Sequence, residues 1–221
     1  MLRMKFSNNK TIAFLPKLFL IIALLSSAIG SYPLAKAYVG QYLLARAWQL
    51  QLIDNQKAQV SAIIEPLQKR RKIKPWPWAD FAPIAKLSFN RLNTAQIVLN
   101  KDSGQALAFG PGVNQFSLLG LEQHNSDFVV ISAHNESHFS ILKELVLGDS
   151  VTLTLSSGKR QTFIVDKLTV MNVNTEQLVL FDKHGNHNNK HQINELILVT
   201  CYPFNGVNNK TPLRYVVRLI R

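Results

Sequence analysis

Residues 196–204 read Leu196-Ile197-Leu198-Val199-Thr200-Cys201-Tyr202-Pro203-Phe204, an apolar run that ends at a cysteine. Its first four side chains are apolar and partly β-branched, which is typical of a buried β-strand. Cys201 follows where the strand ends, next to loops, a place where catalytic groups are often found. It is the only cysteine of the 221 residues, so no intramolecular disulfide can form. A lone thiol is usually a small buried hydrophobe, so its neighbours must decide whether it is a nucleophile.

The chain from residue 83 onward has short apolar runs with period-two alternation, separated by turn signals such as those over 101–104, 110–112 and 156–159. One short helix is expected, over 139–146. The fold class predicted from many short strands in one domain is mainly β, an antiparallel barrel or sandwich. The expected strands are 85–89, 95–99, 128–133, 151–155, 162–170, 178–181, 196–200 and 214–219.

Two further residues beside expected strands carry suitable chemistry. His134 follows the run 128–133, and Arg214 opens the run after the loop that follows Cys201. An imidazole can assist thiolate formation and later protonate an amine leaving group. A guanidinium, permanently charged, can stabilise an oxyanion. Alternation also puts Arg218 on the face of Arg214, displaced along the strand.

The N-terminal residues predict a membrane anchor. Basic residues precede an apolar stretch over 11–35, in which 18–35 carries no charge and is about long enough to span a bilayer. The positive flank predicts a cytoplasmic N-terminus over 1–10 and export of everything after residue 35. A cleaved signal peptide is the alternative, since small residues follow the apolar centre. Residues 36–74 are expected to form a juxtamembrane helix, as a stalk or on the membrane surface, and a basic linker ended by prolines.

The net charge of +12 is unevenly distributed. Residues 1–75 hold twelve Lys and Arg and two acidic residues, whereas residues 76–221 hold thirteen basic and eleven acidic residues. The basic excess lies beside the apolar segment, so it favours contact with anionic lipid over nucleic acid, for which no motif is present. His184, His187 and His191 lie in one polar segment without nearby cysteines or paired carboxylates, so we expect no metal site and no cofactor.

Three motifs together resemble the sortase family. Residues 196–201 are similar to its TLxTC signature, residues 130–139 to its segment with histidine, and residues 212–217 to its arginine strand. Ala133 and Asn135 stand where the family has Gly and Arg. The resemblance covers roughly residues 75–221. Residues 76–80, 106–112 and 201–204 look most similar to the sortases of Gram-negative bacteria.

The resemblance implies an eight-stranded barrel over 75–221 that acts as a cysteine transpeptidase. It implies cleavage of an LPxTG-like sorting motif on a surface or secreted protein, a thioester on Cys201 and transfer to an amine. Carried over, His134 is the acid/base, Arg214 the oxyanion or positioning residue, and Thr200 a contributor to substrate binding. The expected location is the inner membrane, single-pass, with the domain in the periplasm. Two alternatives are a hydrolytic cysteine endopeptidase and a non-catalytic domain that binds envelope polymers.

Overall fold

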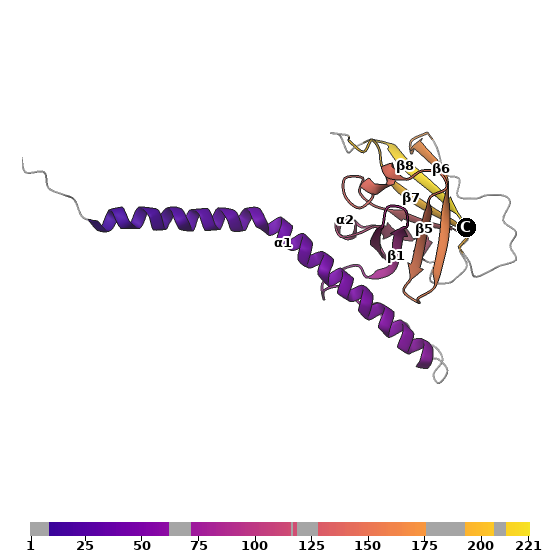
Figure 1. Cartoon of the computed structure of the whole chain (residues 1–221), viewed down its shortest axis with the longest axis horizontal. Helices are drawn as coiled ribbons and strands as arrows, with labels where there is room; N and C mark the ends of the chain where they lie inside the picture. The colour runs from indigo at the N-terminus through magenta and orange to yellow at the C-terminus, as the bar shows by residue number, and fades with distance from the viewer. Residues whose placement is uncertain (1–8, 62–71, 116, 119–127, 176–192, 206–210) are drawn as a thin grey trace, which may run out of the picture. The chain divides into compact units, whose positions relative to one another are not determined.

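The computed structural model describes residues 9–61, 72–115, 117–118, 128–175, 193–205 and 211–221 (Figure 1). Within these residues eight strands close into one barrel. The strands are β1 (Pro83–Phe89), β2 (Thr94–Leu99), β3 (Gly112–Val113), β4 (Phe128–Ser132), β5 (Ser150–Leu155), β6 (Arg160–Asn172), β7 (Glu195–Cys201) and β8 (Leu213–Ile220). The helical elements are α1 (Asn9–Ser61), α2 (Gly104–Leu107) and the 3-10 helix η1 (Ser140–Glu144).

The strand order around the barrel is β1-β2-β3-β4-β7-β8-β6-β5. Neighbouring strands are antiparallel except for β2 with β3 and β4 with β7, which run parallel. The prediction of a mainly β, eight-stranded barrel is confirmed. The expected run 178–181 lies outside the described residues, and the eighth strand is instead β3, which the sequence did not predict.

The barrel interior is filled by alternate side chains of the strands. In β6, Gln161, Phe163 and Val165 are buried while Thr162 and Ile164 are exposed, as the pleat of a one-sided sheet requires. Burying one large apolar side chain contributes roughly 1.5–3 kcal/mol. The largest buried side chains of this core are Leu87, Phe89, Ile131, Phe139, Leu142, Leu153, Phe163, Leu196 and Leu198.

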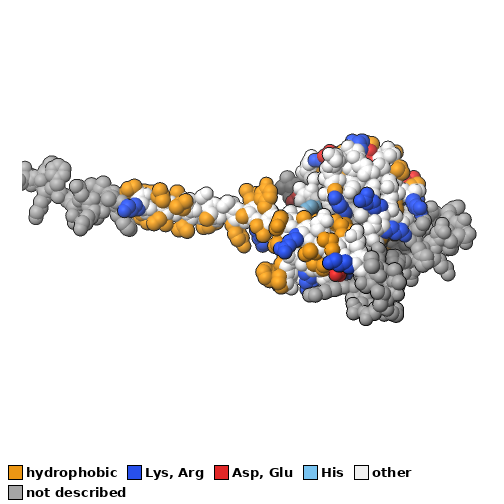
Figure 2. All heavy atoms as spheres, turned by 60° about the horizontal axis from the view of Figure 1, so that its bottom comes forward, with side chains coloured by type: hydrophobic (Ala, Val, Ile, Leu, Met, Phe, Trp, Pro, Cys, Tyr) orange, Lys and Arg blue, Asp and Glu red, His pale blue; other side chains and the backbone are white. Residues whose placement is uncertain are grey.

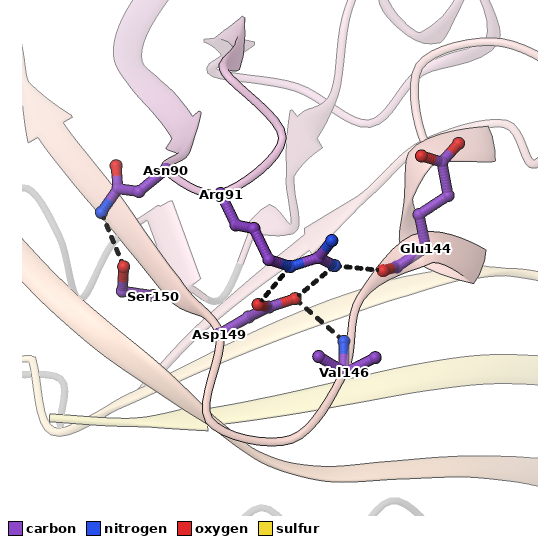
Figure 3. A network of polar contacts seen from close by, with 6 residues as sticks. All are labelled: Asn90, Arg91, Glu144, Val146, Asp149 and Ser150. Atoms are coloured by element: carbon purple, nitrogen blue, oxygen red, sulfur yellow. Dashed lines mark hydrogen bonds and ion pairs between the residues drawn. The ribbon is translucent and has the colours of Figure 1, made fainter.

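A polar network fastens the β1–β2 turn to the segment before β5 (Figure 3). Arg91 donates from Nε and Nη2 to the two carboxylate oxygens of Asp149, over 2.6 and 2.9 Å, and also bonds the carbonyl of Glu144. Asp149 also accepts from the backbone N–H of Val146 at 2.9 Å. The bond with Arg91 lowers the pKa of the Asp149 carboxyl, and its burial opposes that shift. The ionised carboxylate is therefore the form that this turn stabilises.

Helix α1 joins the expected membrane segment and the expected juxtamembrane helix without a break. Side chains 16–39 are exposed all round, and many are apolar (Figure 2). This helix is long and apolar enough to cross a membrane, which a signal sequence would be as well. It is compatible with a single-pass anchor.

The later part of α1 belongs to the same compact unit as the barrel, Tyr42–Arg221. Leu44 is 1% exposed and shares a hydrophobic cluster with Phe81 and Leu99, to which Trp76 and Phe109 also pack. This stretch therefore packs on the barrel and is more than the expected stalk or membrane-surface helix. The boundaries predicted at residues 10, 35 and 74 stay predictions.

Polar side chains also fasten this part of α1. The Nδ2 of Asn55 donates to the carbonyl of Ser156 at 2.9 Å, and the Oε1 of Gln51 accepts from the N–H of Ile73 at 2.7 Å. Asn55 and Gln51 are both buried. They lie one turn apart, on the stripe that begins at Leu44.

Candidate functional site

The parallel pairing of β4 with β7 places His134 and Cys201 at the same end of neighbouring strands. Ser132 pairs with Val199, and His134 and Cys201 each lie two residues beyond that pair. Cys201 is the last residue of β7 and is half-buried, whereas His134 follows β4 and is exposed. The thiol and the imidazole therefore come from equivalent positions on adjacent strands, next to solvent.

Arg214 reaches the same end from the other side of β7. It is the antiparallel partner of Cys201 in the pairing of β7 with β8. Its Nη1 donates to the carbonyls of Thr211 and Leu213, over 2.7 and 2.8 Å. These bonds hold one side of the guanidinium against its own chain segment.

Arg218, the other arginine on this face, lies near carboxylates. Its Nε is 3.5 Å from Asp166 and its Nη2 is 3.5 Å from Glu195. It pairs with Ile197, four residues before Cys201 on β7. The structure therefore gives Arg218 two acidic neighbours and a place away from the end of β7.

Thr200 and Asn135 connect the segment after β4 with the end of β7. The hydroxyl of Thr200, in a residue 2% exposed, donates to the carbonyl of Ala133 at 2.7 Å. The Nδ2 of Asn135, in a residue 5% exposed, donates to the carbonyl of Pro203 at 2.9 Å. Sequence reasoning gave Thr200 a substrate contact and did not include Asn135. The only signal for Asn135 was its departure from the Arg of the sortase segment.

An aromatic cluster follows Cys201. The rings of Tyr202 and Tyr215 are stacked with centroids 6.3 Å apart, and Phe204 meets Tyr215 edge to face at 5.1 Å. Burial raises the pKa of Tyr215, and the neighbouring Tyr202 raises it further. Tyr215 is the strand partner of Thr200, one residue before Cys201, and both Phe204 and Tyr215 pack against the core of the barrel.

His138, the second histidine after β4, lies in a different environment. Burial lowers its pKa, a bond to the backbone of Ala108 opposes this, and the nearby His134 lowers it further. The side chain of Gln96 donates to the carbonyl of His138. These contacts fit a packing role for His138 and not a part in catalysis.

The part of the chain that forms the barrel and this site is similar to known proteins. The family model described as the sortase domain matches residues 87–220, which include His134, Cys201 and Arg214. The chain belongs to the sortase family. Sortase D of Bacillus subtilis (strain 168) is 36% identical over 89 residues. That match spans 40% of this chain and 40% of the length of sortase D.

Solved sortase structures share the fold. Sortase A from Corynebacterium diphtheriae superposes with a TM-score of 0.50 at 17% identity, covering 89% of this chain and 94% of that one. A crystal structure of Streptococcus agalactiae sortase C1 gives 0.50 at 18% identity, covering 81% and 96%. These likenesses support the sortase barrel.

Proposed function

We propose that this chain is a sortase-type cysteine transpeptidase in which Cys201 is the nucleophile, His134 the acid/base and Arg214 the oxyanion stabiliser. The observation that carries the proposal is the strand register. It aligns Cys201 with Arg214 across β7 and β8 and puts His134 at the matching position beyond β4. Membership of the family supports the reaction class.

The chemistry follows from these three side chains. The Cys201 thiolate attacks the carbonyl carbon of the scissile peptide bond, and the electron pair moves to the carbonyl oxygen. Arg214 stabilises that negative charge. As the intermediate collapses, the C–N bond breaks, His134 gives a proton to the departing amine, and a thioester remains on Cys201. A second amine then attacks the thioester and loses a proton to His134, and the thiolate leaves.

The proposed substrate is a surface or secreted protein that carries an LPxTG-like C-terminal sorting signal, cut between Thr and Gly. Membership of the sortase family supports this substrate class. The sequence likeness of residues 76–80, 106–112 and 201–204 supports a place among the sortases of Gram-negative bacteria. Thr200 as a substrate-binding residue stays a prediction. In the described structure its hydroxyl donates to the carbonyl of Ala133.

The proposed location is the inner membrane, with the N-terminus in the cytoplasm and the barrel in the periplasm. The exposed apolar surface of α1 over 16–39 and the basic residues before it support this orientation. Attachment or processing of envelope proteins would follow from such a position.

The experiment is cleavage of a library of sorting-motif peptides by wild type and Cys201→Ala, with products analysed with and without an added amine. The proposal predicts an amine-dependent ligation product that Cys201→Ala does not form. Cleavage products that do not change with added amine would indicate an endopeptidase. A Cys201→Ala variant as active as wild type would overturn the proposed nucleophile.

A further inference from the structure

The residues on either side of His134 are each bonded to residues on either side of Cys201. Before the histidine, the Ala133 carbonyl accepts the Thr200 hydroxyl at 2.7 Å. After it, the Asn135 amide donates to the Pro203 carbonyl at 2.9 Å. The two catalytic candidates thus lie between two cross-links that join their backbone segments.

Both cross-links use buried polar groups. Asn135 is 5% and Thr200 2% exposed, so neither donor can exchange its protein partner for water without local opening. A buried polar side chain needs a partner, and these two find theirs in the opposite segment. The bonds therefore fix the distance between the segments better than two exposed side chains would.

On the strand side of His134, the N–H of Ala133 also donates to the carbonyl of Val199 in β7, at 3.3 Å. The side chain of His134 itself is exposed. Its carbonyl accepts from the N–H of Phe139 at 3.0 Å, and Phe139 is fully buried in the core. That bond shapes the turn after His134 but does not connect it with β7. The connection to the end of β7 after the histidine runs through Asn135.

We propose that Asn135 is a positioning residue that works with Thr200 to hold the backbone of His134 beside Cys201. This inference rests on the proposed function, because it assigns Asn135 a part in the same reaction. Asn135 does not touch the reacting atoms in this account. It acts through His134, by keeping the imidazole within reach of the thiol and of the departing amine.

The test compares Asn135→Ala with Asn55→Ala in the full chain. Asn55 is a matched control: it is 2% exposed, and its amide also donates to a backbone carbonyl at 2.9 Å, that of Ser156 in the β5–β6 turn. Both variants lose one buried amide and its bond to a backbone carbonyl, and Asn55→Ala also loses the bond that its Oδ1 accepts from Gln51 at 3.5 Å. We expect Asn135→Ala to lower kcat by about 10- to 100-fold with KM little changed, and Asn55→Ala to lower stability with kcat near wild type.

A second readout separates positioning from a structural role. The rate of Cys201 alkylation by iodoacetamide is measured against pH for wild type, His134→Ala and each asparagine variant, since only the thiolate reacts. The profile of Asn135→Ala should move toward that of His134→Ala, and that of Asn55→Ala should follow wild type. An Asn135→Ala profile that superimposes on wild type would overturn the inference, whatever its kcat.

Thr200 provides a variant pair if Asn135→Ala does not fold. Thr200→Val removes the hydroxyl at nearly constant volume, whereas Thr200→Ser keeps the hydroxyl and removes only the methyl group. We expect Thr200→Val to shift the alkylation profile as Asn135→Ala would and Thr200→Ser to return it to wild type; equal profiles for both variants would overturn the inference. Failure of the proposed function is seen separately, as cleavage by Cys201→Ala.

Discussion

Replacing Leu44 with Ala tests whether the later part of α1 is a structural part of the barrel unit. Leu44 is 1% exposed and packs with Phe81 and Leu99. A helix that only spaced the domain from a membrane would tolerate this change. A helix that completes the second hydrophobic cluster would not.

The expected loss follows from the burial of this side chain. Leu→Ala in a core costs about 2–5 kcal/mol, depending on how far the surroundings can collapse into the cavity. Helix α1 covers the cluster from one side only and its opposite face is open, since Leu50 is 42% exposed. The helix can therefore settle inward, and we expect about 2–3 kcal/mol, the lower part of that range.

The measurement is urea unfolding of the fragment 42–221, followed by circular dichroism, for wild type, Leu44→Ala and Leu50→Ala. Leu50→Ala is the control because it removes the same atoms from the exposed face, where about 0.5 kcal/mol or less is expected. The melting temperature of Leu44→Ala should fall by about 4–12 °C, at roughly 2–4 °C per kcal/mol for a domain of this size. Equal unfolding free energies for the two variants would refute the packing role of α1.

Three further predictions concern the barrel and the site. Arg91→Met removes the partner that lowers the pKa of Asp149. The variant should therefore be less stable than wild type above the usual carboxyl pKa of about 4, and the difference in unfolding free energy should vanish as pH falls through the pKa of the folded state. A difference that stays the same between pH 7 and pH 2 in acid unfolding would contradict this. Gly112→Ala would put a Cβ 2.0 Å from the Lys101 carbonyl oxygen, a backbone atom, and should cost about 3 kcal/mol in urea unfolding; an unchanged midpoint would show that β3 can shift. Arg214→Lys should lower kcat by at least about tenfold, because an ammonium lacks the planar fork of donors; peptide-cleavage kinetics equal to wild type would exclude an oxyanion role for the guanidinium.

Periodicity in the sequence was sufficient to predict most strands of the barrel. Alternating runs such as that of β6 have one buried and one exposed face, so their pattern survives in the sequence. Strand β3 has only two residues, too few to alternate. The turn expected over 101–104 was also only partly right, because Ser103 caps the short helix α2, with its hydroxyl accepting from the N–H of Ala106.

The packing of α1 was missed because its buried stripe is partly polar. Gln51 and Asn55 continue the stripe that begins with Leu44, and polar residues weaken an apolar pattern. Tertiary hydrogen bonds, which no local pattern reports, explain their burial. Trp76 and Trp78 are two residues apart and differ in burial, because Trp76 packs with Phe81 whereas Trp78 is 78% exposed.

For the site, motif resemblance supplied the three candidate residues, and the structure supplied their alignment. His134 and Cys201 are far apart in sequence, and only the parallel register of β4 with β7 shows that they occupy equivalent positions. The two cross-links, from Thr200 to Ala133 and from Asn135 to Pro203, depend on that register too. Hydrogen bonds between the ends of two strands cannot be inferred before the pairing of those strands is known.

The proposed thioester on Cys201 is tested by the intact mass of the protein during turnover of a sorting-motif peptide. The account predicts an added mass equal to the acyl part of the peptide, located on Cys201 by peptide mapping and released by hydroxylamine as expected for a thioester. His134→Ala should accumulate less of it, and Cys201→Ala none. Efficient cleavage by wild type with no adduct on Cys201, or an adduct mapped to another residue, would contradict the account.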